Sequence, residues 1–287
     1  MGNVIGAWFE RDVVRATGPD AAKFLQGQIS QDVETLVEAG SAWTLLLDPS
    51  GKLTTWMRIT RVDGDEFLLD CAAGWSETML TRLNRFKIRV ACDFVLLDGW
   101  RMLSVRGATP DPALVAADTV LAPAAGLSIG VVGYDLLGPN VSEPDGITLD
   151  EDAVEQYRIA HGIPEMGAEL DDTVIAAEIG AWFVEEAVSW TKGCYTGQEL
   201  VARVDSRGSN TPRRLRSVEL TAPALRGDDV VVDGAVVGTI TSVFGTAALA
   251  RVAADVHGWP VLNLFAPIFA VVMMVHLFQS VTRAAAP

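Results

Sequence analysis

The stretch Lys192-Gly193-Cys194-Tyr195-Thr196-Gly197-Gln198-Glu199 holds the densest chemical signal in the chain. Two glycines bracket its cysteine, which predicts a backbone that turns tightly or approaches a ligand closely. Lys192 lies two positions before the Cys194 thiol and would favour the thiolate, the nucleophilic and metal-binding form. We therefore take Cys194 and Lys192 as candidate catalytic residues. The alternative is an inert, partly buried thiol, since free cysteine commonly packs as a small hydrophobe.

Positive charge gathers in the same part of the chain. Residues 192–216 contain six basic and two acidic residues, a net of +4, whereas the whole 287-residue chain has a formal net charge of −15. Such a strip would attract an anionic ligand, although a solvated linker is the alternative interpretation. The overall acidity argues against broad binding of nucleic-acid backbone. Direct tRNA binding through this strip is therefore the least favoured function.

The motif at 192–199 resembles the K-G-C-[FY]-x-G-Q-E signature of the YgfZ family, folate-binding relatives of the glycine-cleavage T-protein that assist iron–sulfur cluster assembly. The resemblance extends over about residues 11–255. Its further matches are Gly18-Pro-Asp-Ala-Ala-Lys-Phe-Leu-Gln-Gly-Gln28, Leu47-Asp-Pro-Ser-Gly-Lys52, Arg158-Ile-Ala-His-Gly-Ile-Pro164 with Gly167 and Glu169, and Val201-Ala-Arg-Val-Asp-Ser-Arg207.

The resemblance implies an α+β fold: a GcvT-like multi-domain body around a folate cleft, with a small C-terminal β-barrel module. We expect residues 1–214 to form the body from two interleaved α+β subdomains, and residues 215–257 to form the barrel module without the family's usual closing strands. Residues 258–287 are then an atypical apolar tail.

The resemblance also implies a role in iron–sulfur cluster assembly or repair, with tetrahydrofolate or a one-carbon derivative as cofactor and assembly factors or client proteins as partners. Effects on tRNA modification would be indirect. One cysteine cannot hold a four-iron cluster, so Cys194 would be a transient ligand, a redox thiol or an attachment point, and no permanent metal site is expected. The folate-binding candidates are Glu169, Asp172, Trp190, Gln198, Glu199, Arg203 and Arg207.

A tetrahydrofolate-dependent aminomethyltransferase is the enzymatic alternative. Those enzymes usually have a Phe-Ile-Gly type of sequence at the position of Cys194–Gly197, and a tyrosine at the position of Met166. These two departures make glycine-cleavage activity the less favoured hypothesis.

The cysteine pattern and the chain's start favour the cytoplasm. The three cysteines are too few and too far apart for a disulfide framework, and the first ten residues do not resemble a secretory signal. The 20 residues 259–278, by contrast, lack any Asp, Glu, Lys or Arg. We consider a membrane anchor, a packed helix and a reading-frame slip for this tail.

Local patterns predict the order of secondary structure. Helices are expected after Gly18, over Trp75–Phe86, over Asp150–Gly162 and, briefly, from Gln198. Strands are expected at Trp43–Leu47, Leu53–Ile59, Phe67–Leu69 and Ile88–Leu97, with one or two short strands within 109–150. After Pro212 the expected strands are Leu215–Leu220, Val230–Val232 and Val236–Val243, the last two joined by an Asp233-Gly234 turn.

Overall fold

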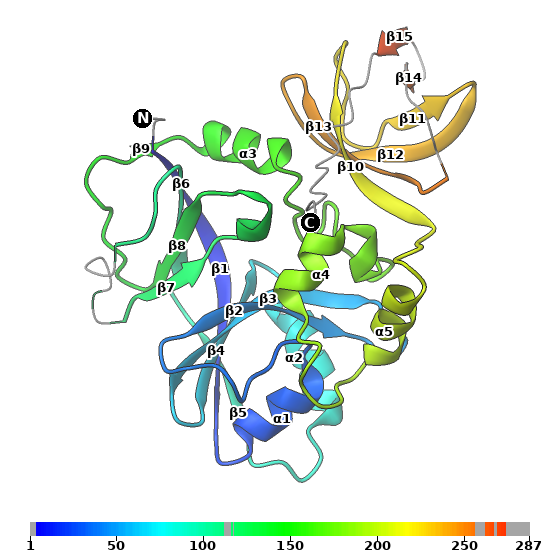
Figure 1. Ribbon diagram of the computed structural model, residues 1–287. Helices are drawn as coiled ribbons and strands as arrows, with labels where there is room; N and C mark the ends of the chain where they lie inside the picture. Colours follow the sequence, from blue (N-terminus) through cyan, green and yellow to red (C-terminus); the bar gives the residue numbers. More distant parts are fainter. Residues whose placement is uncertain (1–3, 112–115, 117, 256–261, 267–268, 274–287) are drawn as a thin grey trace, which may run out of the picture. The chain divides into compact units, whose positions relative to one another are not determined.

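The computed structural model describes residues 4–111, 116, 118–255, 262–266 and 269–273. The chain divides into two compact units (Figure 1). The first contains residues 1–155 and 163–211, and the second contains residues 156–162 and 212–287.

The first unit is a nine-stranded sheet with helices packed on it. Its strands are β1 Ile5–Thr17, β2 Ser41–Leu47, β3 Leu53–Asp63, β4 Glu66–Ala72, β5 Asp93–Leu97, β6 Arg101–Arg106, β7 Val120–Pro123, β8 Gly133–Gly138 and β9 Thr148–Leu149. Its helices are α1 Ala21–Gln28, α2 Ser76–Phe86, α4 Ala181–Ala187 and α5 Gln198–Ser206, with 3-10 turns η2 Leu127–Ile129 and η3 Ala176–Glu178. Helix α3, Glu151–Ala160, begins in this unit and ends in the second.

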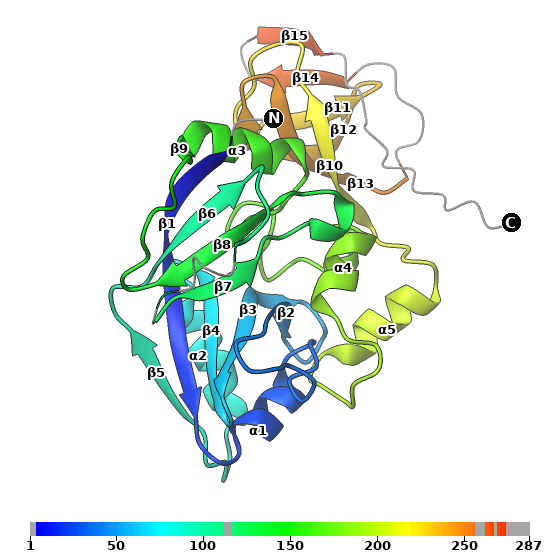
Figure 2. The same cartoon turned by 60° about the vertical axis from the view of Figure 1, so that its left-hand side comes forward.

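The long strand β1 joins the two halves of this sheet. Residues 11–17 pair with β4, while residues 5–10 pair with β6, so one continuous strand serves both halves. The strand order is β2-β3-β4-β1-β6-β8-β7, with β5 and β9 also paired to β1 (Figure 2). A displacement of either end of β1 would therefore be transmitted to both halves of the sheet.

The principal core lies between this sheet and helices α1 and α2. Leu25 of α1 and Met79 and Leu83 of α2 are buried against Met57 and Leu69 of the sheet. The side chains of α2 that face the core are four residues apart, as expected of one helix face. This packing fixes the end of α1 and the start of β3, the two segments on which the candidate site is built.

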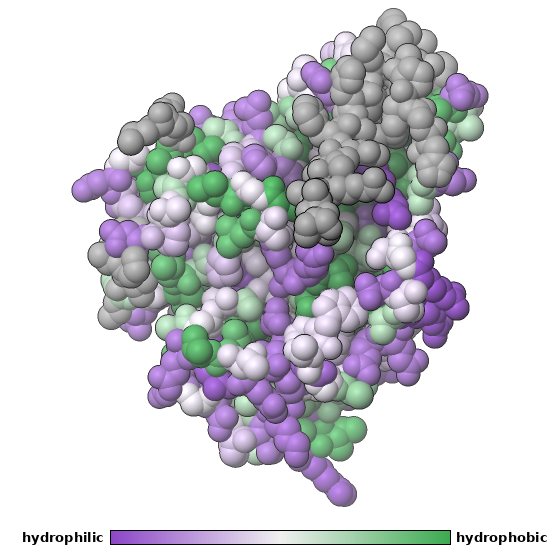
Figure 3. Space-filling view, viewed as in Figure 1, coloured by the Kyte–Doolittle hydropathy of each residue, from purple (hydrophilic) through white to green (hydrophobic). Residues whose placement is uncertain are grey.

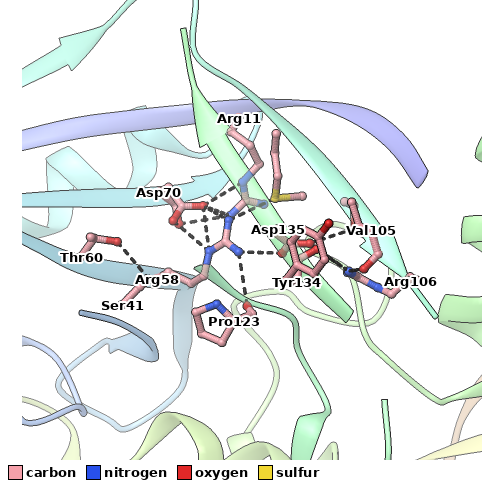
Figure 4. Close-up of polar contacts among 12 residues, drawn as sticks. Arg11, Ser41, Arg58, Thr60, Asp70, Val105, Arg106, Pro123, Tyr134 and Asp135 are labelled. Atoms are coloured by element: carbon pink, nitrogen blue, oxygen red, sulfur yellow. Dashed lines mark hydrogen bonds and ion pairs between the residues drawn. The ribbon is translucent and has the colours of Figure 1, made fainter. Parts of the chain in front are cut away.

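A buried ionic cluster connects β3 and β4 with β8 (Figure 4). The Arg58 guanidinium lies between two carboxylates, with Nη2 2.8 Å from Asp70 Oδ1 and Nη1 2.6 Å from Asp135 Oδ2. Arg11 also contacts Asp70 at 2.7 Å, and Arg106 contacts Asp135 at 3.0 Å. Because both buried carboxylates are paired on two sides, the cluster holds strands from both halves of the sheet in register.

The second unit is a six-stranded antiparallel sheet. Its strands are β10 Arg213–Glu219, β11 Asp229–Val232, β12 Ala235–Phe244, β13 Ala247–Ala253, β14 Leu262–Ala266 and β15 Phe269–Met273, in the order β10-β13-β12-β11-β14-β15. Val218, Val230 and Ile240 belong to its core. The predicted Asp233-Gly234 turn is confirmed, with both residues at positive φ, as a tight turn between two strands requires.

The structure confirms the α+β class and most of the predicted elements, but it corrects two. The predicted strand Ile88–Leu97 begins only at Asp93, because Ile88 is exposed and Arg89 has a φ of 57°, which interrupts an extended strand. The described residues of the stretch 109–150 form three strands, β7, β8 and β9, rather than one or two.

The tail also differs from the helical interpretations. Where the structure describes its backbone, at 262–266 and 269–273, it forms strands β14 and β15, so the helix expectation is wrong for these residues. An apolar run without clear periodicity suits either form. The rest of 258–287 lies outside the described residues, and so does half of the segment 259–278 that we considered as a membrane anchor. Within the described part of the chain, every helix is too short or too polar to cross a membrane.

Candidate functional site

The residues around Cys194 form a loop that starts and ends at the C-terminal end of α1 and the residues directly after it. We call residues 189–197 the Cys194 loop. At its start, the Ser189 N–H donates to the Ser30 carbonyl at 3.0 Å, and near its end the Thr196 N–H donates to the Gly27 carbonyl at 3.1 Å. Both ends are therefore anchored to one short piece of chain.

Lys192 fixes the middle of the Cys194 loop. Its ammonium donates hydrogen bonds to the carbonyls of Gln26, Ile29 and Gln31 at 2.7, 2.7 and 2.8 Å. Gln26 lies in the last turn of α1, and Ile29 and Gln31 follow the helix. Carbonyls at a helix C-terminus lack helical partners, and positive charge is favoured there. Burial lowers the pKa of Lys192 to about 8. All three ammonium donors of Lys192 are used by carbonyls, so the side chain holds the loop in place. The expectation that Lys192 favours the Cys194 thiolate stays a prediction.

Two glycines allow the end of the loop to pack against the β2–β3 turn. Gly197 has a φ of 87°, and a Cβ placed on it would lie 2.6 Å from the Asp48 carbonyl oxygen and 2.7 Å from Leu47 Cβ. Gly51 of that turn also has a φ of 87°, and a Cβ there would overlap Leu200 of α5. The structure thus brings together three stretches that stood out in the sequence, at 18–28, 47–52 and 192–199.

Replacing Gly197 with alanine should destabilise the fold. The left-handed conformation alone costs an alanine about 1–2 kcal/mol, and the Asp48 contact adds to that cost because the turn must move away. Urea unfolding should therefore show a free energy of unfolding lower by at least that amount.

Gly193→Ala is the matched control for this prediction. Gly193 does not adopt a positive φ, and a Cβ placed on it would meet nothing within 4 Å. Its unfolding free energy should stay within about 1 kcal/mol of wild type. Equal stability of the two variants would contradict the close packing inferred for Gly197.

The Cys194 side chain is exposed, whereas Cys71 and Cys92 are buried. Burial raises the pKa of Cys71 to about 12 and also raises that of Cys92, which keeps both as thiols. The neighbouring Tyr195 is buried beneath the loop, and Trp190 is 50% exposed. The loop therefore presents one sulfur to solvent from a backbone anchored on both sides.

A second group of residues lies inside the same unit, around β2 and β3. The rings of Trp43 and Trp56 stack with centroids 4.2 Å apart, and Phe183 of α4 packs at 5.2 Å from Trp56. Met166 Sδ accepts a hydrogen bond from the Trp56 N–H, which places the 165–170 segment on this strand. That segment includes Glu169, which is fully buried and whose carboxylate accepts the Glu165 N–H at 3.0 Å.

This interior group has the chemistry that a reduced pterin requires. The buried carboxylate of Glu169 suits ring N–H donors, and the stacked indoles offer flat apolar surface. The indole Nε1 of Trp43 is buried without a hydrogen-bond partner among the described residues, and such a donor can serve a ligand carbonyl. This combination of a buried acceptor, a buried donor and apolar rings fits the pterin of tetrahydrofolate.

The other predicted site residues lie on the surface. Asp172, Glu199, Arg203 and Arg207 are exposed, and Gln198 uses its Oε1 to accept the Tyr195 N–H at 3.1 Å. Hydrophilic residues gather over α5 in Figure 3, where three of these side chains originate. The structure thus groups Trp190 and residues 192–207 around the loop and α5, while Glu169 is buried in the 165–170 segment, whose Met166 contacts Trp56.

Sequence reasoning singled out Trp190 and missed Trp43 and Trp56. The signal that could have found them is the register of the predicted hairpin, which pairs Leu45 with Trp56 and so places Trp43 diagonally beside it. Among the described residues, no three His, Cys, Asp or Glu side chains are grouped in a way that could hold a metal ion.

Comparison with known proteins places the chain in a family. No protein-family profile matches it. An uncharacterized protein of Haemophilus influenzae is 30% identical over 199 residues, which cover 69% of this chain and 67% of that protein. The mitochondrial iron–sulfur cluster assembly factor IBA57 homolog of Pyricularia oryzae is 30% identical over 69% of this chain and 53% of its own length. The tRNA-modifying protein YgfZ of Klebsiella pneumoniae is 28% identical over 68% and 65%.

The crystal structure of glycine cleavage system aminomethyltransferase T from Bartonella henselae superposes with a TM-score of 0.75, at 15% identity, over 96% of this chain and 86% of that one. The fold therefore defines a GcvT-like protein. Together with the curated relatives, it shows that the chain belongs to the YgfZ/GcvT-like family, whose named members include iron–sulfur cluster assembly factors and tRNA-modifying proteins. The matched segments span between about half and two thirds of the curated relatives.

Proposed function

We propose that this protein binds tetrahydrofolate, or a one-carbon derivative, in its first unit and assists iron–sulfur cluster assembly or repair through Cys194. Its effect on tRNA modification is then indirect, through the cluster enzymes that perform it. The observation that carries this proposal is the exposed Cys194 sulfur on a loop whose backbone is anchored to α1 and to the β2–β3 turn.

The thiol acts as a transient ligand of a cluster that is cargo. Cys194 loses its proton to water, and the thiolate donates an electron pair to one iron atom. A four-iron cluster needs about four thiolates, so an assembly or client protein supplies the others. When the client cysteine takes over that iron, the bond to Cys194 breaks and the thiolate is free again. Anchoring the loop suits this exchange, because a preorganised ligand loses little entropy on each contact.

The folate is held by the interior group and by two arginines at the C-terminal end of α5, Arg203 within the helix and Arg207 directly after it. The Glu169 carboxylate accepts from the pterin N–H groups, and the Trp43 indole N–H donates to its carbonyl. The exposed Arg203 and Arg207 attract the anionic glutamate tail. Bound tetrahydrofolate supplies a one-carbon acceptor and a reduced ring. Within this arrangement, Glu169 is favoured over the exposed Asp172 as the pterin carboxylate, since a charge-assisted bond is stronger away from water.

Titration of the purified full chain with tetrahydrofolate tests the folate part of the proposal. Tryptophan fluorescence should change saturably, because Trp43 and Trp56 lie at the proposed site. Glu169→Gln should weaken binding at least tenfold, while Cys194→Ala should bind as wild type does. Glu143→Gln, which alters an exposed carboxylate elsewhere, is the control and should bind normally.

Two results would count against the folate site. One is a folded wild-type chain that shows no saturable change. The other is a Glu169→Gln variant with wild-type affinity. Circular dichroism of each variant shows whether it is folded, and Trp43→Phe, which removes the indole N–H but keeps a ring, provides a second weakened variant if Glu169→Gln does not fold.

A further inference from the structure

A hollow on the first unit lies between α2 and the start of β3, where no site has been assigned. Its volume is about 400 Å³, and its lining residues are Thr54, Glu77, Thr78, Thr81, Arg82 and Arg85. The spacing of the helical residues explains the arrangement, since Thr78 and Arg82, like Thr81 and Arg85, are one helical turn apart. Hydroxyl and guanidinium groups therefore face the same space.

Arg82 is held rigidly at this hollow. Its Nε donates to the Leu47 carbonyl at 2.9 Å, and its Nη1 donates to Gln28 Oε1 at 3.1 Å. The guanidinium carbon lies 4.1 Å from the centroid of the Phe86 ring, which fixes the plane of the group. The side chain is positioned by three separate elements, so its orientation is set before any ligand arrives.

The remaining nitrogen of Arg82 has no partner. The residue is only 7% exposed, and its Nη2 is buried without a hydrogen-bond acceptor among the described residues. Leaving a donor of a charged group buried and unsatisfied costs the fold the desolvation energy of that group. Buried polar groups without a partner are rare in folded proteins, so the Arg82 Nη2 calls for an explanation such as a bound ligand.

The charges at the hollow favour an anion. Within the part of the chain that the structure describes, the ion pairs involve neither Arg82 nor Arg85. Burial lowers the pKa of Arg82, and repulsion from Arg85 lowers it further, while Asp48 acts in the opposite direction. Glu77 also lines the hollow but lies in the first turn of α2, two turns from Arg85. An anion beside the two arginines would relieve their repulsion.

We propose that this hollow binds an oxyanion, the phosphate or carboxylate group of a ligand, between Arg82, Arg85 and the hydroxyls of Thr78 and Thr81. Arg85 and the two threonines are exposed, so they can turn toward the anion and admit it to the Arg82 guanidinium. Arg82 also bonds to Leu47 and to Gln28, next to the two segments that anchor the Cys194 loop. Occupancy would therefore stiffen the support of that loop. The proposal does not depend on the proposed function.

The test is NMR titration of the full chain with sodium phosphate and, separately, with sodium glutarate at constant ionic strength. The Nε–Hε signal of Arg82 should shift saturably with one or both ions. Phosphate alone would identify a phosphate ligand, glutarate alone a carboxylate ligand, and both a general oxyanion site. Arg85→Met should weaken binding at least tenfold, and Lys23→Met, which removes an exposed charge on α1, should leave it unchanged.

Two outcomes would overturn this site. One is the absence of a saturable shift with either ion. The other is equal weakening by Arg85→Met and Lys23→Met, which would indicate nonspecific attraction. Arg82→Met removes two bonds that position α1 and β2, so this variant is informative only if it folds. Arg85→Met and a Thr78→Val, Thr81→Val double variant alter exposed residues, and they decide the question in either case.

Discussion

Replacing Arg58 with alanine is expected to lower the free energy of unfolding by about 3–5 kcal/mol, the usual cost of removing one partner from a buried ion pair. Arg58 is fully buried, and its guanidinium contacts both Asp70 and Asp135. Without it, each buried carboxylate keeps only one arginine partner, Arg11 for Asp70 and Arg106 for Asp135. Urea unfolding followed by circular dichroism measures the loss.

The same variant should unfold at higher pH in an acid titration. Burial alone would raise the pKa of Asp70, but attraction to Arg58 and Arg11 outweighs it and leaves that pKa below its usual value. For Asp135, burial is likewise outweighed, by Arg106 and Arg58. A carboxyl whose folded pKa is depressed stabilises the fold above its unfolded pKa, near 4, and loses that contribution as pH falls toward the folded pKa. Removing Arg58 raises both folded pKa values, so the loss begins at higher pH.

Arg15→Ala is the matched control. Arg15 also pairs with a carboxylate across neighbouring strands, Glu66 at 3.3 Å, but the two side chains are 47% and 36% exposed. An exposed pair contributes about 0–1 kcal/mol. Should Arg58→Ala and Arg15→Ala prove equally stable, the buried cluster would not hold the sheet as we describe.

The sequence predicted the pieces of the candidate site more completely than their connections. The turn at 48–52 and the loop at 192–199 could each be recognised from glycine spacing and polar residues. Their contact could not, because it depends on a Cβ-free approach of Gly197 to the Asp48 carbonyl. The role of Lys192 was hidden for a similar reason. Its partners are main-chain carbonyls, which any residue carries, so residue types alone do not reveal them.

Buried charges were equally hard to foresee. Arg58 stands within an apolar strand, where a polar residue would ordinarily be taken to face solvent. Its partner Asp70 lies directly across from it on β4, but that pairing is visible only once the register of β3 and β4 is known. Asp135 comes from β8, in the stretch 109–150 where the sequence pattern predicted one or two short strands without giving their bounds. Tertiary pairing, rather than local propensity, decides such positions.

Loss of the Cys194 sulfur should have the largest effect on function. Among the residues that the structure describes, the Cys194 thiol is the only exposed one, since Cys71 and Cys92 are buried. Cys194→Ala leaves the anchoring of the loop intact, because those hydrogen bonds involve Lys192 and main-chain groups. The variant should therefore fold as wild type does, yet be unable to hold a cluster iron. Cys194→Ser should fail in the same way, because a hydroxyl at neutral pH is a poor iron ligand.

The most direct test is the activity of iron–sulfur enzymes in a bacterial strain that lacks its own family member and expresses this full chain. Wild type should restore activity, Cys194→Ala should reduce the restored activity at least tenfold, and Thr191→Ala, an exposed neighbour in the loop, should restore it fully. Immunoblots and a native thiol titration, with one fast thiol in wild type and none in Cys194→Ala, verify that the variants are present and folded. Full restoration by Cys194→Ala would contradict the account.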